Sequence, residues 1–158
     1  MEIQGSRTAE GCRFAIVVSR FNEEVTAGLL KGARQALAEA RVRDEDVTIL
    51  RVPGAFEIPL AAMRAAESGR FDAVICVGCL IKGDTMHFEH IASAACQGIM
   101  EAAAATGVPM ALGVLTTLTE EQALARAADG DANKGREAAF AAVEMATLFR
   151  RLQEGMDA

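Results

Sequence analysis

The sequence predicts an α/β protein in which a four-stranded parallel sheet lies between two layers of helices, forming a three-layer sandwich. Short apolar runs that suit buried strands alternate with longer amphipathic stretches that suit helices. Because parallel strands are joined by right-handed crossovers, this alternation places helices on both faces of one sheet. No linker or repeat divides the 158 residues, so we expect one domain spanning residues 1–158.

Four apolar runs are the predicted strands, and they occupy residues 14–18, 47–52, 73–77 and 110–115. Each run is short and rich in aliphatic or β-branched residues, as in strands that are buried on both faces. Residues 1–12 precede them as an irregular N-terminal extension. Within it, Glu2, Ile3 and Gln4 could form a short strand that pairs with a neighbouring subunit.

Helical periodicity predicts helices at residues 23–40, 58–68, 87–106, 119–128 and 135–154. Pro59 is tolerated in the first turn of the second helix. Gly69 and Gly107 are suitable C-terminal stops for the second and third helices. Thr119 precedes two acidic residues and is the expected N-terminal cap of the fourth helix.

The number of strands suits a flavodoxin-like sheet with the strand order 2-1-3-4. In such sheets ligands lie beyond the carboxyl ends of the strands, near the point where the strand order reverses. This rule gathers residues 19–22, 53–57, 78–85 and 116–119 on one rim. The third of these segments leads from a strand into a helix whose free N–H groups favour an anion. Both histidines of the chain, His87 and His90, follow it directly.

Composition excludes several classes of protein. A hydrophobic content of 51% with 3 prolines indicates a globular chain, and the net charge of −6 argues against nucleic-acid binding. No apolar run approaches the roughly 20 residues that span a bilayer, and the N-terminus lacks the order of a signal peptide. The 4 cysteines lie in apolar runs, which suits reduced thiols and a cytoplasmic location.

Several segments, in order and at matching spacing, resemble the lumazine synthase family from about residue 13 to residue 152. They are Ser-Arg-Phe-Asn at 19–22, Val-Pro-Gly-Ala-Phe-Glu-Ile-Pro at 52–59, Gly-Cys-Leu-Ile-Lys-Gly-Asp-Thr-Met-His-Phe-Glu at 78–89, Gly-Val-Leu-Thr-Thr at 113–117, Glu-Gln-Ala and Arg-Ala within 121–127, and Asn-Lys-Gly at 133–135. The resemblance implies a transferase of riboflavin biosynthesis that acts at its penultimate step. Such an enzyme condenses 5-amino-6-(D-ribitylamino)uracil with 3,4-dihydroxy-2-butanone 4-phosphate to give 6,7-dimethyl-8-ribityllumazine, phosphate and water. The resemblance implies neither a metal nor an organic cofactor.

The resemblance also implies roles for single residues, with His87 as the proton-transfer residue. The residues matching the ribitylaminouracil site are Phe21, Ala55, Phe56, Glu57, Cys79, Leu80, Ile81 and Leu112. Those matching the butanone phosphate site are Gly83, Asp84, Thr85, Arg126 and Lys134. Three positions depart from the family pattern: Lys82 replaces a frequent arginine, Asp84 a small residue, and Leu112 a phenylalanine that covers the ring.

The implied reaction needs residues of these kinds. An amine attacks a ketone, water leaves to give an imine, phosphate is eliminated, and ring closure and a second dehydration follow. Each step moves a proton near neutral pH, where histidines titrate. Elimination of phosphate builds negative charge, which Arg126 and the N–H groups of residues 83–85 could stabilise.

Each assignment has a structural alternative. His87 could be a surface or capping residue, or could pair with His90 on a metal, although no third ligand has suitable spacing. Cys76-x-x-Cys79 has the spacing of a redox motif, but Cys76 lies in a predicted buried strand, which favours inert packing. Phe21 could be a core residue, Arg126 and Lys134 solvated charges, and Glu57 only an acid at a helix N-terminus.

Small residues surround most of the helix predicted at 87–106, whereas covering one sheet needs a single apolar stripe. The surplus predicts a contact with another copy of the chain. The resemblance implies homopentamers with active sites between neighbours, some of which assemble into sixty-subunit shells. The loop at 129–133 lacks the longer insertion of pentamer-only relatives, which favours a shell. Association with riboflavin synthase is implied by resemblance alone.

Two other functions compete with the enzyme. One is a catalytically silent shell protein that binds lumazine or flavin, and the presence of His87 and Arg126 argues against it. The other is a flavodoxin-like signalling or redox domain. A signalling domain would need a phosphoacceptor aspartate at a strand end, whereas the first strand here is followed by Ser19 and Arg20.

Overall fold

The computed structural model describes residues 1–157, with side chains up to residue 155. Its four strands are β1 (Phe14–Ser19), β2 (Val47–Val52), β3 (Ala73–Ile81) and β4 (Met110–Thr117). They form one parallel sheet in the order β2-β1-β3-β4. The predicted α/β sandwich and its flavodoxin-like strand order are therefore confirmed.

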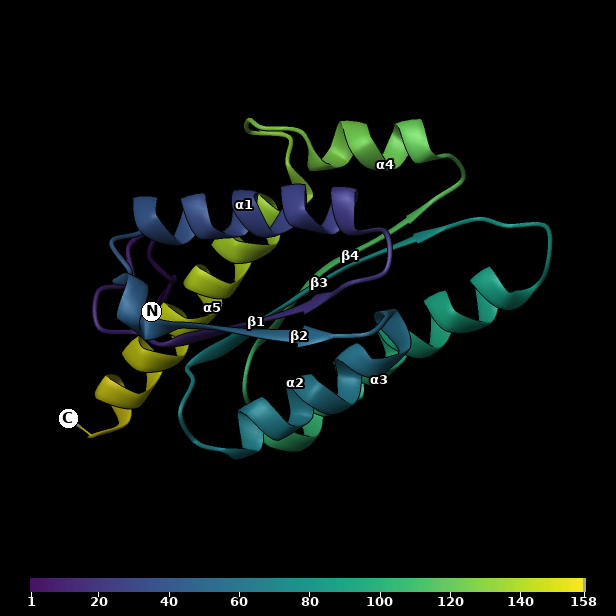
Figure 1. Cartoon of the computed structure of the whole chain (residues 1–158). Helices are drawn as coiled ribbons and strands as arrows, with labels where there is room; N and C mark the ends of the chain where they lie inside the picture. Colours follow the sequence, from purple (N-terminus) through teal and green to yellow (C-terminus); the bar gives the residue numbers. More distant parts are fainter. Residues whose placement is uncertain (158) are drawn as a thin grey trace.

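Helices cover both faces of this sheet (Figure 1). On one face lie α1 (Glu23–Glu39), α4 (Glu120–Ala127) and α5 (Lys134–Asp157), and on the other lie α2 (Ile58–Glu67) and α3 (His87–Thr106). Two 3₁₀ turns, at Asp44–Asp46 and Ala55–Glu57, precede β2 and α2. Helix boundaries agree with the predicted ranges to within a turn. Within residues 1–157, none of the helices combines the length and the apolar character that crossing a membrane would require.

The core has two halves because successive side chains of a strand point to opposite faces. Phe14, Ile16 and Val18 of β1 pack with α1 and α5, whereas Ala15 and Val17 pack with α2 and α3. All five are at most 2% exposed. Full burial of a valine, isoleucine or phenylalanine side chain stabilises the fold by about 1.5–3 kcal/mol. The interior strand β1 therefore contacts both helical layers and holds them in place.

The structure corrects the predicted end of β3, which continues to Ile81 instead of turning at Gly78. Pairing of β1 with β3 ends at Val18 and Val77, but pairing of β3 with β4 continues to Ile81 and Thr117. Strand β4 is longer than predicted for the same reason. Gly78 serves close packing within the strand, since a Cβ there would lie 2.9 Å from Ile58 Cδ1. The tips of β3 and β4 consequently extend beyond β1 (Figure 1).

The N-terminal extension is irregular, and residues 2–4 form no strand within this chain. It packs along α5, where the Ser6 N–H donates to Thr147 Oγ1 at 2.7 Å. Gly5 lies against the same helix so closely that a Cβ would meet the Glu144 carbonyl oxygen at 2.0 Å. The extension therefore pairs with neither edge strand of its own sheet, β2 or β4, because it packs against α5.

Candidate active site

A cleft of about 440 Å³ lies beyond the carboxyl ends of β1, β2 and β3. Most of the predicted site residues line it, namely Phe21, Ala55, Phe56, Glu57, Cys79, Leu80, Ile81, Gly83, Thr85 and His87. The strand-end rule therefore predicted three of the segments that line this cleft, whereas Thr116 and Thr117 of the fourth segment line a different cleft. Asp84 is exposed and does not line it.

Two phenylalanine rings border the cleft and face solvent. Phe21 is 69% exposed and Phe56 is 61% exposed, so the alternative in which Phe21 is a core residue is wrong. The backbone before Phe21 is tied to the β2 loop, because the Arg20 N–H donates to the Val52 carbonyl and the Phe21 N–H to the Pro53 carbonyl. Phe21 is thus held at the rim, where a flat ligand could stack on its ring.

Asn22 also lines the cleft and was not among the predicted site residues. Its backbone is left-handed, with φ of 62°, a conformation that asparagine tolerates better than most residues. Its side-chain amide donates to the Cys79 carbonyl at 3.0 Å. The available signal was a polar residue with a short side chain directly after Phe21, at the start of a helix.

Glu57 lies in the turn between β2 and α2, and its carboxylate is part of that turn. The Gly54 N–H donates to Glu57 Oε2 at 3.0 Å. This contact agrees with the structural alternative for Glu57. A carboxylate has about four acceptor sites, however, so Glu57 can bind a ligand hydroxyl while it holds Gly54.

The helix α3 brings His87 to the cleft together with Phe88 and Ile91, which the sequence prediction missed. Their spacing places them on one face of the helix, and that periodicity was a usable signal. The Thr85 hydroxyl accepts from the His87 N–H at 3.4 Å. His90 is not among the lining residues, and residues 1–157 contain no cluster of three or more side chains suited to a metal.

The remaining predicted residues, Leu112, Arg126 and Lys134, line a second cleft of about 420 Å³ at the outer edge of β4. The two clefts have no lining residue in common. An Arg126 guanidinium N–H donates to the Gln122 carbonyl at 3.0 Å, and Lys134 Nζ pairs with Glu137 Oε2 at 2.6 Å. Within one chain, these two cations are therefore not brought to the cleft that contains His87.

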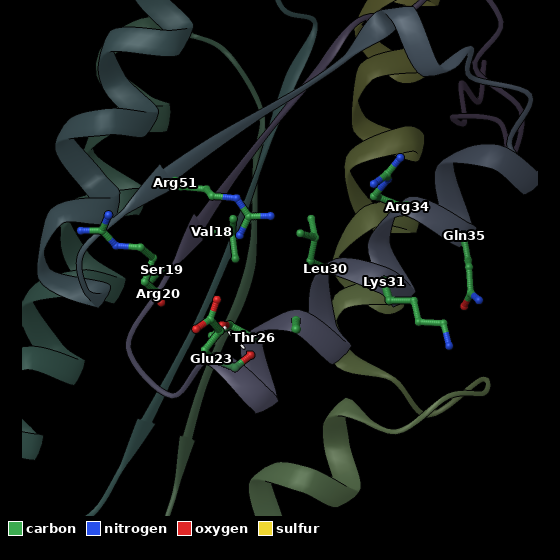
Figure 2. A pocket seen from close by; sticks show the side chains of 11 residues that line it. Val18, Ser19, Arg20, Glu23, Thr26, Leu30, Lys31, Arg34, Gln35 and Arg51 are labelled. Atoms are coloured by element: carbon green, nitrogen blue, oxygen red, sulfur yellow. Dashed lines mark hydrogen bonds between the residues drawn. The ribbon is translucent and has the colours of Figure 1, made fainter.

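A third cleft, of about 380 Å³, opens between α1 and the end of β2. Figure 2 shows the side chains of Arg34 and Arg51 around the buried Val18 and Leu30. Arg34 is paired there with Asp44 at 3.8 Å. None of the predicted site residues lines this cleft.

The two cysteines of the Cys76-x-x-Cys79 motif point to opposite faces of β3, because they are three residues apart in a strand. Burial raises the pKa of the Cys76 thiol to about 12 and that of Cys79 to about 11. A redox pair requires a reactive thiolate and a partner within bonding distance. The structure therefore supports inert packing for both cysteines.

A doubly wound α/β sheet with an apolar cleft and a few polar groups at its strand ends defines a protein that binds small molecules. Comparison with known proteins narrows this class. The chain belongs to the 6,7-dimethyl-8-ribityllumazine synthase family, whose model matches residues 11–150.

Two relatives that carry the name 6,7-dimethyl-8-ribityllumazine synthase illustrate the likeness. The protein from Salinibacter ruber is 48% identical over 151 residues, covering 96% of this chain and 97% of the relative. The protein from Syntrophus aciditrophicus is 48% identical over 149 residues, covering 94% of this chain and 97% of the relative. The similarity thus extends over nearly the full length of each protein.

Proposed function

We propose that this protein condenses 5-amino-6-(D-ribitylamino)uracil with 3,4-dihydroxy-2-butanone 4-phosphate to 6,7-dimethyl-8-ribityllumazine, releasing phosphate and water. Family membership supports the reaction. The observation that carries the proposal is the cleft itself, in which two exposed aromatic rings, free strand-end backbone and His87 meet. These groups suit a flat ring, its polar edge and a proton transfer, respectively.

The aromatic half of the cleft would bind the ribitylaminouracil. Phe21 offers a face for stacking on the pyrimidine, and residues 55–57 lie where the ribityl chain would extend. Because β3 extends beyond the end of β1, its backbone at residues 79–81 has no strand partner on the side that faces β1. The Cys79 carbonyl is satisfied by Asn22. Alternate residues of a strand point their N–H and C=O groups to the same side. The backbone N–H and C=O of Ile81, two residues after Cys79, would therefore bind the polar edge of the pyrimidine.

The turn between β3 and α3 would bind the phosphate group of the second substrate. Gly83 and Thr85 border the cleft just before α3 begins, where free N–H groups and the dipole of a 20-residue helix favour an anion. At Asp84, whose side chain is exposed, we propose that only the backbone takes part. An acidic side chain next to a phosphate would otherwise repel it.

Arg126, Lys134 and Leu112 would complete the site from a neighbouring copy of the chain. The cleft that they line and the cleft of His87 have no lining residue in common. The cleft of Arg126, Lys134 and Leu112 lies along β4, an edge strand that another subunit can reach. On binding phosphate, Lys134 would exchange its pairing with Glu137 for the stronger charge of the substrate. The site is then only half formed within one chain.

His87 would move the protons of the reaction. It lines the same cleft as Phe21 and the phosphate-binding turn, so that it can act on the amine, the imine and the departing phosphate in turn. Stabilisation of the leaving group would come from the backbone N–H groups of the turn and from Arg126. Holding the two substrates side by side supplies a further part of the acceleration.

Homopentamers are the assembly that we propose, with the site at each subunit boundary. The helix α3 buries only Ala95, Ile99 and Ala102 within the chain. Much of its remaining surface consists of small side chains, and Met100 is 74% exposed. Another copy could approach such a surface closely. The short loop at 129–133 supports further assembly into an icosahedral shell of sixty subunits, in which riboflavin synthase could be enclosed.

The N-terminal extension would contribute to this assembly. We propose that residues 2–4 pair as a strand with a neighbouring subunit, since Ile3 is 40% exposed and the sheet has open edges at β2 and β4. An open edge invites an added strand. We place the enzyme in the cytoplasm because its cysteines are free and three of them are buried, as suits a reducing compartment.

The decisive experiment is to mix the purified protein with both substrates and to record the fluorescence of the lumazine product. Product formation without added metal or organic cofactor is the expected result. Binding of ribitylaminouracil without product would instead identify a silent lumazine- or flavin-binding protein.

A second experiment tests whether the site is shared between subunits. His87→Ala and Arg126→Ala are each expected to reduce turnover when assembled alone. Assemblies formed by refolding the two variants together should regain activity, because intact His87 and intact Arg126 then meet at some boundaries. Equal activity of mixed and unmixed samples would show that each chain uses its own residues.

A further inference from the structure

Asn133 is buried in the loop between α4 and α5, with 1% of its surface exposed. Its amide nitrogen Nδ2 lies within hydrogen-bond distance of three carbonyl oxygens: those of Gly28 at 3.1 Å, Ala127 at 3.0 Å and Ala128 at 3.1 Å. Its Oδ1 accepts from the Arg136 N–H at 3.0 Å. One side chain therefore joins α1, the end of α4 and the start of α5.

The helix α1 provides the space for this side chain. A Cβ on Gly32 would lie 2.1 Å from Asn133 Oδ1, and a Cβ on Gly28 would lie 2.5 Å from the Ala127 carbonyl oxygen. Gly28 and Gly32 are one helical turn apart and so share a face. Nearby, a Cβ on Gly135 would lie 1.9 Å from the Leu29 carbonyl oxygen. Larger residues at these positions would displace the loop from α1.

The two cations of the second cleft lie in the helices on either side of this loop. Ala127, whose carbonyl Asn133 binds, directly follows Arg126, and Lys134 directly follows Asn133. With eight residues, α4 is too short to be stable alone, since isolated helices below about 12 residues are marginal. Its C-terminal end depends on contacts such as those of Asn133.

We propose that Asn133 is a positioning residue that fixes Arg126 and Lys134 relative to each other, so that both charges meet one phosphate group. This inference rests on the proposed function. A clamp of two long side chains stabilises a developing charge only if their backbones are already in place. Loosening the loop should therefore weaken binding of the phosphate-bearing substrate and leave binding of the pyrimidine substrate unchanged.

Two substitutions test the role. Asn133→Ala removes the whole amide, whereas Asn133→Asp keeps the shape and the Oδ1 acceptor but removes the donors. Both should raise the KM for the butanone phosphate, and the inhibition constant of inorganic phosphate, by ~10-fold, the size expected for a weakened hydrogen bond to a charged group. The KM for ribitylaminouracil should stay within about twofold on the same scale.

Thr147→Val is the matched control for lost stability. Its hydroxyl is buried in α5 and bonds Ser6, away from the loop of Asn133. It should lower the melting temperature and leave both KM values unchanged. Equal rises in both KM values for the Asn133 variants, changes in melting temperature alone, or failure of both variants to fold would overturn the positioning role.

A further comparison separates this inference from the function on which it rests. In a background of Arg126→Ala with Lys134→Ala, adding Asn133→Ala should not change the inhibition constant of phosphate, because nothing is left to position. A further ~10-fold loss there would show that Asn133 acts by another route. If the two cation substitutions alone leave phosphate inhibition unchanged, the proposed phosphate site is wrong, whatever Asn133 does.

Discussion

The side-chain amide of Asn22 donates a hydrogen bond to the Cys79 carbonyl at 3.0 Å. This contact joins the start of α1 to the extended tip of β3, where β1 has already ended. It satisfies a strand carbonyl that would otherwise lack its neighbour. It also holds the adjacent Phe21 at the rim of the candidate cleft.

Asn22→Ala should destabilise the protein by about 2 kcal/mol, from the lost hydrogen bond and from a left-handed backbone that alanine resists. Asn22→Gly is the matched control, since glycine accepts φ of 62°. It should cost about 1 kcal/mol, for the hydrogen bond alone. Chemical denaturation measures both values. Equal losses would show that backbone strain contributes nothing at this position.

His87→Ala should slow turnover by ~10²-fold or less, the usual magnitude for one general acid–base group. Binding of the two substrates should change little, because the remaining cleft residues stay in place. His90→Ala is the control, since His90 does not line the cleft, and it should retain activity. Steady-state kinetics of lumazine formation check both. Near-complete loss of activity in His87→Ala would indicate an obligatory role beyond proton transfer.

Leu112→Phe should tighten binding of ribitylaminouracil by roughly 2- to 10-fold, because an aromatic contact contributes about 0.5–1.5 kcal/mol beyond the buried area. Leu112 is 54% exposed on the edge strand, so that a larger ring needs no repacking of the core. Leu118→Phe serves as the control, since Leu118 is 62% exposed and outside both clefts. Fluorescence titration measures the affinities, and similar values for both variants would argue against contact of Leu112 with the ring.

The Arg136 guanidinium binds the Glu39 carboxylate through two hydrogen bonds, of 2.7 and 2.8 Å. These bonds lower the pKa of Glu39 from its ordinary value of 4.5. A carboxylate with a lowered folded-state pKa stabilises the fold above its unfolded pKa, and this contribution is lost as the pH falls through the folded value.

Glu39→Gln should therefore lower the melting temperature at neutral pH, and its difference from the wild type should shrink as the pH falls below about 4. Melting curves across this range give the measurement. Glu10→Gln is the control, since Glu10 contacts Arg41 through one bond at 3.1 Å, and its effect at neutral pH should be smaller. A difference for Glu39→Gln that is constant with pH would contradict the assigned ion pair.

Much of the fold follows from local pattern. The apolar run at Phe14–Ser19 and the helical period of Glu23–Glu39 depend on burial and on spacing within a few residues. The ends of β3 and β4 were predicted too early because their last residues pair only with each other. Thr116 and Thr117 are β-branched, but they are polar and so do not continue the apolar run by which β4 was predicted.

Within the candidate site, the strand-end rule brought Phe21, Phe56 and His87 to one cleft because the carboxyl ends of parallel strands meet at one edge of the sheet. Asn22 was missed, since its partner is a carbonyl 57 positions away in the chain. Sequence order also could not separate Arg126 from the cleft of His87. That separation depends on where α4 lies in space.

The sequence by itself determined the α/β class and the family, because these depend on local period and on motifs in register. It also predicted the strand order, which the structure confirms, and the residues of the candidate site, which stay a prediction. The tertiary structure decided how long β3 runs, that Asn22 and Asn133 tie distant segments together, and that Arg126 and Lys134 lie in a cleft of their own. These features arise from contacts between segments far apart in the chain. The physical reason is that backbone carbonyls and small-residue surfaces have no side-chain pattern that reveals their partners.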